Sequence, residues 1–85
     1  MRTDYGDLLS FREIDTRHGL VKGSAFRAFK ALGGRLTEGE DFVYLDAAGH
    51  AAEIESLRQA GRLYPTTVNA VLLTASGYRL LRERL

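Results

Sequence analysis

The chain has 85 residues, of which 45% are hydrophobic and none is cysteine. That length favours one domain over two, because the fraction of surface buried on folding falls quickly in small chains. The lack of cysteine excludes disulfides, thiolate-bound zinc, iron–sulfur clusters and cysteine nucleophiles. We therefore expect a single domain over residues 1–85 with an ordinary hydrophobic core.

Charge is unevenly distributed along the chain, although the formal net charge is only +1. Residues 12–35 contain six basic side chains against two acidic ones, and five arginines follow position 57 against one glutamate. Residues 36–57 contain six acidic side chains and no lysine or arginine. This pattern predicts a polarised domain with a basic face, and ordinary solvated surfaces are the alternative interpretation.

The sequence offers no candidate for a membrane span or an export signal. The apolar run over residues 70–73 is far shorter than the roughly 20 residues that cross a bilayer. Asp4 and Asp7 stand where a signal peptide needs a basic flank and an apolar stretch. We expect a cytoplasmic protein with no membrane partner.

A helix-turn-helix is predicted over about residues 10–33. Ser10 and Glu13 have the spacing of a capping box, so a helix starts there and runs to about residue 18. Gly19 suits the left-handed position that ends it. A second helix over 24–32 follows, and its predicted buried stripe is formed by Ala25, Phe26, Phe29 and Leu32.

The second half alternates strand and helix signals. We predict a turn and strand over 37–46, a helix over about 47–60 capped by Asp46, and strands within 63–73. Pro65 cannot donate to a sheet, so its strand belongs at an edge. Thr74 caps a last helix over 75–85, whose apolar stripe is Tyr78, Leu81 and Leu85.

Catalytic and metal-binding patterns are weak in this sequence. His18 and His50 are far apart and match no ligand spacing. The acidic cluster Glu38, Glu40 and Asp41 lacks the alternating oxygen ligands of a calcium loop. We predict that the protein is not an enzyme and has no metal or cofactor.

The basic helix-turn-helix is the strongest functional pattern. A recognition helix buries one stripe and exposes donors for phosphates and base edges on another. We predict that Arg27 reads a base and that Lys22, Lys30 and Arg35 contact the DNA backbone. Two further residues complete the candidate DNA-binding set, namely Arg17 and Ser24.

The run over residues 13–30 resembles the opening of excisionase-like and MerR-like winged-helix regulators. It has their Gly-hydrophobic pair after the first helix, Gly19-Leu20, and an aromatic-basic step in the second, Phe26-Arg27. The resemblance implies an α+β, winged helix-turn-helix-like fold of three to four helices with a small antiparallel sheet. It also implies double-stranded DNA as the partner.

Two shorter patches look like the amino-terminal domains of phage antirepressor proteins. The first is the Gly-x-Asp-Phe turn at residues 39–42, and the second is the Leu-Thr-x-x-Gly helix start at residues 73–77. Both resemblances imply an action on DNA or on its regulators, as in a phage-like transcriptional or recombination regulator.

The acidic stretch falls where the wing of such a fold should touch phosphate. The wing is then supplied by residues 62–71, or else the acidic 38–55 surface binds a protein. A small DNA-binding regulator, acting as a homodimer or with cooperative neighbours, is the leading hypothesis. The alternative is a protein–protein interaction module, such as an antirepressor-like or toxin–antitoxin component.

Overall fold

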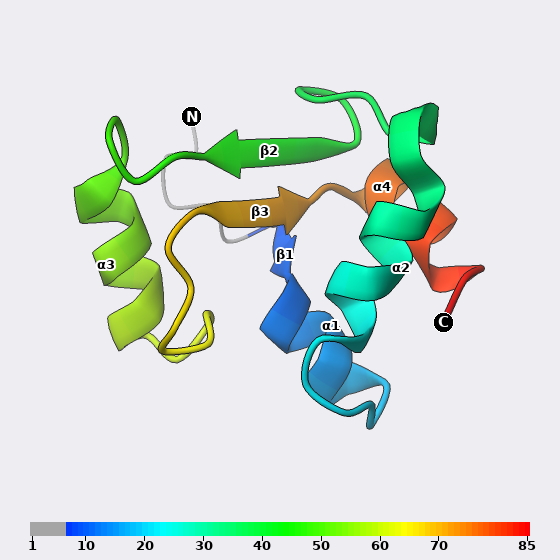
Figure 1. Cartoon of the computed structure of the whole chain (residues 1–85), viewed down its shortest axis with the longest axis horizontal. Coiled ribbons are helices and arrows are strands. Elements are labelled where there is room, and N and C mark those ends of the chain that lie inside the picture. Colours follow the sequence, from blue (N-terminus) through cyan, green and yellow to red (C-terminus); the bar gives the residue numbers. More distant parts are fainter. Residues whose placement is uncertain (1–6) are drawn as a thin grey trace.

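Four α-helices and three short strands follow one another in residues 7–85, the part of the chain that this computed structural model describes (Figure 1). In chain order these elements are β1 (Leu9–Ser10), α1 (Phe11–Arg17), α2 (Ser24–Leu32), β2 (Phe42–Leu45), α3 (Ala51–Gln59), β3 (Ala70–Leu73) and α4 (Ala75–Arg82). A single 3-10 turn, Gly33–Arg35, extends α2. The expected α+β class, with three to four helices and a small antiparallel sheet, is confirmed.

The sheet has the order β1-β3-β2, and both pairings are antiparallel. Leu73 of the central strand pairs with Leu9 on one side and with Phe42 on the other. In Figure 1, α3 lies at one end of the sheet, and α1, α2 and α4 gather at the other. In the sequence, the helix pair α1–α2 lies between the edge strands β1 and β2. In space, this pair lies next to α4.

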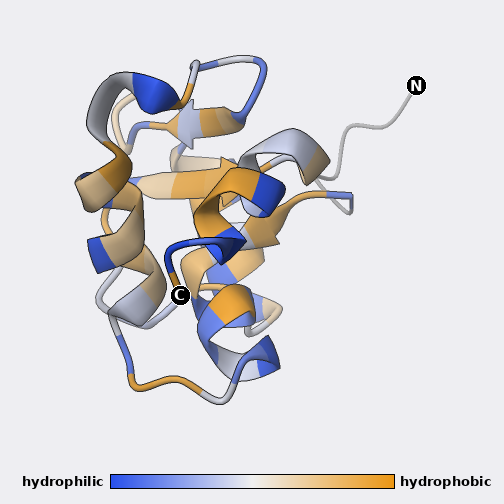
Figure 2. Cartoon of the chain, turned by 90° about the vertical axis from the view of Figure 1, so that its right-hand side faces the viewer, coloured by the Kyte–Doolittle hydropathy of each residue, from blue (hydrophilic) through white to orange (hydrophobic). Residues whose placement is uncertain are grey.

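The hydrophobic core consists of two clusters that share strand β3. The first joins the helices α1, α2 and α4, and its buried members are Ile14, Ala25, Ala28, Leu32, Leu36, Leu73 and Leu81. The second lies beneath α3, and its buried members are Leu45, Ile54, Leu57, Leu63, Ala70 and Leu72. In Figure 2 the hydrophobic residues concentrate in the strands and in the helical turns beside them.

Local capping signals set the helix ends. Ser10 accepts from the amide of Glu13 at 3.1 Å, and the Glu13 carboxylate accepts from the Ser10 amide at 2.9 Å, so the predicted capping box is present. Gly19 has a φ of 65° just after α1. Thr74 caps α4 by accepting from the amide of Gly77 at 3.3 Å.

The predicted inner face of α2 is partly wrong. Phe26 is 46% exposed, whereas Ala25 and Ala28 are buried against the first cluster. Small residues bring α2 close to α1, and the larger Phe29 is only partly buried at the edge of the contact. The buried face of α2 is therefore centred on Ala25, Ala28 and Leu32 instead of on Phe26, which points outward.

Helix α3 begins later than its capping signal predicted. Asp46 does not cap it, because its Oδ1 accepts from the amide of Gly49 at 2.6 Å in a local turn. The helix begins at Ala51, after His50, instead of at residue 47. At the other end of the chain, α4 stops at Arg82 and Leu85 is 39% exposed, so the predicted stripe is one residue too long.

The strand predicted at residues 63–65 is wrong, and the one at 68–73 is confined to Ala70–Leu73. Leu63 is buried, but its carbonyl accepts from the Arg12 guanidinium at 2.9 Å rather than from a strand. The carbonyl of Arg62 accepts from the Ser10 hydroxyl. This segment is held by side chains of β1 and α1, so it needs no sheet partner.

The loop after α2 is joined to the start of α4. The Asp41 carbonyl accepts from the Thr74 amide at 3.0 Å, and the Glu40 carbonyl accepts from the Thr74 hydroxyl at 2.8 Å. Ser76 donates to the Asp41 carboxylate at 2.6 Å, and Gly77 packs directly on the Asp41 carbonyl. The two patches that resemble phage antirepressors therefore meet in one junction.

Candidate nucleic-acid interface

A buried carboxylate fixes the start of α2. Asp15 of α1 is only 1% exposed, and its two oxygens accept from the amides of Ala25 at 2.8 Å and Gly23 at 3.0 Å. The Tyr64 hydroxyl donates to the same carboxylate at 2.5 Å. These bonds satisfy the amides of Gly23, just before α2, and of Ala25 in its first turn, so they fix the start of α2 against α1.

Asp15 was not among the predicted functional residues, because its partners lie 8, 10 and 49 positions away in the chain. No local spacing rule connects them. Burial, together with the hydrogen bond to Asp15 and its negative charge, raises the pKa of Tyr64 to about 12. The tyrosine thus remains a donor to the carboxylate across the ordinary pH range.

The outer face of α2 carries basic side chains that have no acidic partner within the part of the chain that the structure describes. Arg27 and Lys30 are exposed, and neither forms an ion pair within residues 7–85. Arg27 lies along the helix start, 3.5 Å from the Ser24 hydroxyl, and the Lys30 amine lies 5.4 Å from the centroid of the Phe26 ring. Ser24, Arg27 and Lys30 follow one another at a spacing of three residues and form a donor stripe, in which Ser24 is half-buried and the two cations are exposed.

The other predicted DNA contacts are spread around this stripe. Lys22 is exposed just before α2, with its amine 5.1 Å from the centroid of the Tyr64 ring. Arg35 is exposed beyond the helix end. Arg17 lies apart, because its guanidinium is over Tyr78 of α4 at 5.7 Å. The structure thus groups Ser24, Arg27 and Lys30 and separates Arg17 from them.

A terminal arginine, Arg84, joins the basic surface. It lines a groove of about 390 Å³ together with Ser24, Arg27 and Ala31, between α2 and the end of the chain. Its position in a polar, arginine-rich last turn gave no indication that it would approach α2. The groove extends the donor stripe of α2 onto the residues that follow α4.

The connection between α1 and α2 covers residues 18–23. It is longer than the turn of about three to four residues in the common helix-turn-helix. The Leu20 amide donates to the Asp15 carbonyl at 2.8 Å, and the Ser24 amide donates to the Val21 carbonyl at 3.1 Å. These bonds give the connection a defined path despite its length.

Many acidic groups after α2 serve internal contacts. Hydrogen bonds from the Ser76 hydroxyl and the Thr37 amide hold the pKa of Asp41 below its usual value. Asp46 closes its own turn, and Glu55 pairs with Arg58. The acidic surface predicted over 38–55 is therefore partly structural.

The arginine of the segment 62–71, Arg62, is engaged within the protein and is not available as a wing contact to DNA. Arg62 donates to both carboxylate oxygens of Glu13, at 2.9 and 3.1 Å, and to the Leu8 carbonyl at 2.6 Å. Burial alone would raise the pKa of Glu13, but the bonds from Arg62 and Ser10 hold it below the usual value. Arg62 thus ties β1 and α1 to the loop before β3.

Within residues 7–85, no three histidine, aspartate or glutamate side chains gather as a metal site. None of the helices described there has the length and apolar character needed to cross a bilayer. No family model, curated protein or solved structure matches the chain.

Proposed function

We propose that this protein is a small DNA-binding regulator that inserts α2 into the major groove of double-stranded DNA. The observation that carries the proposal is the two-sided character of α2. Ala25, Ala28 and Asp15 hold its inner side, and Arg27 and Lys30 extend from its outer side without acidic partners in the described residues. A recognition helix needs this combination of a fixed axis and available donors.

The donor types on α2 suit different parts of DNA. The Arg27 guanidinium is planar and can donate two hydrogen bonds to the O6 and N7 atoms of guanine. Lys30 is one helical turn further along, and Arg84 lies across the groove, so both suit phosphate oxygens. Arg27 is thus the candidate for sequence recognition, and the other two position the helix.

The arrangement of the sheet supports a winged variant of the motif. Strands β2 and β3 follow α2 as an antiparallel pair, as the strands beside a wing do. Their connection, residues 46–69, contains α3 and is not a short turn. We infer a reduced wing contact, so that most of the affinity comes from α2. A single domain of this size makes few contacts, and a homodimer or cooperative neighbours would supply the remainder.

A protein-binding role for the acidic 38–55 surface is the second candidate. It is supported by Glu38 and Glu40, which are exposed in the loop after α2. It is weakened by Asp41 and Asp46, whose carboxylates accept hydrogen bonds within their own loops. The DNA proposal implies a compartment that contains DNA, which we take to be the cytoplasm, and a role in transcription or recombination.

Fluorescence anisotropy with a short mixed-sequence DNA duplex tests the proposal. Affinity should fall steeply with salt, with a log–log slope of about 0.9 for each phosphate neutralised. Lys30→Gln should reduce that slope by about 1, and Arg27→Gln should weaken binding to a duplex selected from a random library by about 1–3 kcal/mol.

Arg79→Gln is the matched control, because it removes the same charge from an exposed position on α4. It should leave the affinity nearly unchanged. Equal losses of DNA affinity in the Arg27, Lys30 and Arg79 variants would show that only the net charge of the protein matters. That result would contradict the assignment of α2 as the DNA-binding helix. Loss of a protein partner on reversing the charge of Glu38 and Glu40, without DNA binding, would favour the second candidate.

A further inference from the structure

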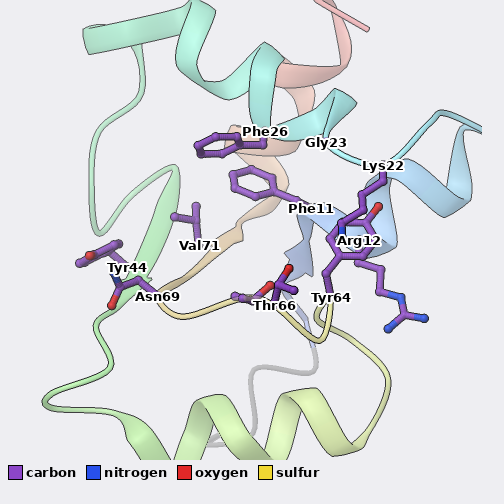
Figure 3. Close-up of a pocket in the computed structure, with 11 residues that line it drawn as sticks. Phe11, Arg12, Lys22, Gly23, Phe26, Tyr44, Tyr64, Thr66, Asn69 and Val71 are labelled. Atoms are coloured by element: carbon purple, nitrogen blue, oxygen red, sulfur yellow. The ribbon is translucent and has the colours of Figure 1, made fainter.

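A pocket of about 530 Å³ opens beside the start of α2 (Figure 3). Its walls come from segments far apart in the chain: α1, the residues before α2, α2 itself, β2, β3 and the loop at 64–69. The pocket is separate from the outer stripe of α2 and was not indicated by any sequence motif. Its size is within the range of about 300–1,000 Å³ typical of small-molecule sites.

Aromatic rings form much of the pocket wall. Phe11 and Phe26 lie together on one side in Figure 3, with ring centroids 5.6 Å apart. Tyr44 stands on β2 beside Val71, and Tyr64 lies toward the opposite side. Phe26 and Tyr44 are 46% and 41% exposed, so their rings are accessible from the opening.

One side of the pocket is cationic. Lys22 and Arg12 both line it, and both lie over the Tyr64 ring, at 5.1 and 5.6 Å from its centroid. Arg12 also donates to the Leu63 carbonyl, but no ion pair within residues 7–85 includes Lys22. Lys22 can therefore turn to a ligand.

The Asp15 carboxylate, which lies beside this cationic side, does not form an ion pair with Lys22 or Arg12. Asp15 is buried beneath Tyr64, and its carboxylate already accepts from the tyrosine hydroxyl and from the Gly23 and Ala25 amides. Two cations thus face one acid whose oxygens are occupied. The polar groups on the rest of the lining are neutral, from Thr66, Thr67 and Asn69.

We propose that this pocket binds a planar aromatic anion, with the ring against Phe26 and Tyr44 and the negative group at Lys22. Aromatic faces favour a flat ring, because offset stacking and edge contacts add to the gain from apolar burial. The cationic side selects a ligand with an acidic group over its neutral counterpart. A free aromatic carboxylate and a nucleoside monophosphate share this chemistry.

The site does not depend on DNA binding by α2. It uses Lys22 and the ring of Phe26. The DNA contacts proposed on the structure are Arg27, Lys30 and Arg84, and of the contacts predicted from the sequence only Lys22 is shared with the pocket. Titrations of the protein alone therefore test the pocket, and failure of either proposal leaves the other standing.

Amide NMR spectra of the full chain, titrated with two matched pairs of probes, test the site. The pairs are naphthoate with naphthalenemethanol, and adenosine monophosphate with adenosine. In at least one pair, the charged member should bind about threefold or more tightly than the neutral one. The largest shifts should fall at residues 22–26, 44 and 64–71.

Two variants and one control identify the groups responsible. Lys22→Gln should remove the preference for the charged probe, and Tyr44→Ala should weaken both members of the pair by about fivefold or more. Arg79→Gln, which removes an exposed charge outside the pocket, should change neither. Unchanged thermal melting of the three variants would show that each one still folds.

The two probe pairs also distinguish the source of the ligand. Preferential binding of adenosine monophosphate would assign the site to a nucleotide, and preferential binding of naphthoate would assign it to an aromatic acid. Equal affinity for charged and neutral probes would overturn the proposal. The absence of binding by all four probes, or shifts outside the pocket, would overturn it as well.

Discussion

Gly77 carries the sharpest stability prediction, because a side chain cannot fit at this position. A methyl group there would lie 1.8 Å from the Asp41 carbonyl oxygen, whereas ordinary contacts begin at 3.4 Å. The two nearest atoms, the carbonyl oxygen and carbon of Asp41, belong to the backbone of the loop before β2, and the third is Cδ1 of Leu73 at 3.0 Å. The Gly77→Ala substitution therefore forces α4 and this loop apart instead of turning a flexible side chain.

The size of the effect follows from the bonds that cross the junction. Separating the segments would break three of them: Thr74 amide to Asp41 carbonyl, Thr74 hydroxyl to Glu40 carbonyl, and Ser76 hydroxyl to Asp41 carboxylate. Each is worth about 1 kcal/mol net. We expect Gly77→Ala to lower the free energy of unfolding by about 3 kcal/mol and Tm by roughly 12–24 °C.

Urea and thermal unfolding followed by circular dichroism measure this loss. Gly34→Ala is the matched control, because a methyl group there meets no heavy atom within 4 Å. It should change the free energy of unfolding by less than about 0.5 kcal/mol. Should Gly77→Ala stay within about 1 kcal/mol of the unaltered protein, the described junction is wrong. If that variant does not fold, Ser76→Ala should still lose about 1 kcal/mol.

Three further predictions concern buried polar contacts. Asp15→Asn should lower the free energy of unfolding by about 3 kcal/mol in urea, because an amide cannot accept all three donors, whereas Tyr64→Phe should cost about 1 kcal/mol. Equal losses would contradict the account of the α2 start. In an alkaline absorbance titration, Tyr64 should ionise near pH 12, and Tyr64→Phe should remove that phase. The stability that this raised pKa contributes is present below pH 10 and is lost between about 10 and 12. The lowered pKa of Glu13 contributes stability above its ordinary value of 4.5 that is lost as pH falls below it. Glu13→Gln should therefore flatten the acid limb of the stability curve, and an unchanged limb would show that the pair with Arg62 is not formed.

The elements that have local sequence signals were predicted close to their observed positions. The capping box at Ser10 and the cap at Thr74 place the starts of α1 and α4, because each needs only residues three positions away. The β-branched and apolar run at 68–73 predicted a strand that contains β3 but begins two residues too early. Helix α2 was placed correctly by its period and by the glycines that follow it, Gly33 and Gly34.

Predictions were wrong at residues whose environment is decided by a partner far away in the chain. Phe26 satisfies the helical period, but contact with α1 selected the smaller Ala28 for the interior. Leu63 was assigned to a strand because it is apolar, whereas side chains from α1 and β1 hold its segment as a loop. The need for glycine at position 77 arises from Asp41, which no local pattern connects to it.

Only part of the candidate site was predicted, because some of its contacts join residues that are distant in the chain. Helical spacing placed Arg27 and Lys30 on one face, and the structure leaves both exposed there. Spacing did not reveal that Asp15 positions this helix, or that Arg84 lines the adjoining groove. These contacts depend on tertiary packing between elements that are not neighbours in the sequence.

We propose that the outer face of α2 is the surface that meets DNA. Amide NMR shifts, mapped while a DNA duplex is added at low salt, test this assignment residue by residue. We expect the largest changes between residues 22 and 35 and at Arg84, with little change in the acidic loop at 38–41. Shifts concentrated in that loop or on α3, with α2 unaffected, would contradict the claim.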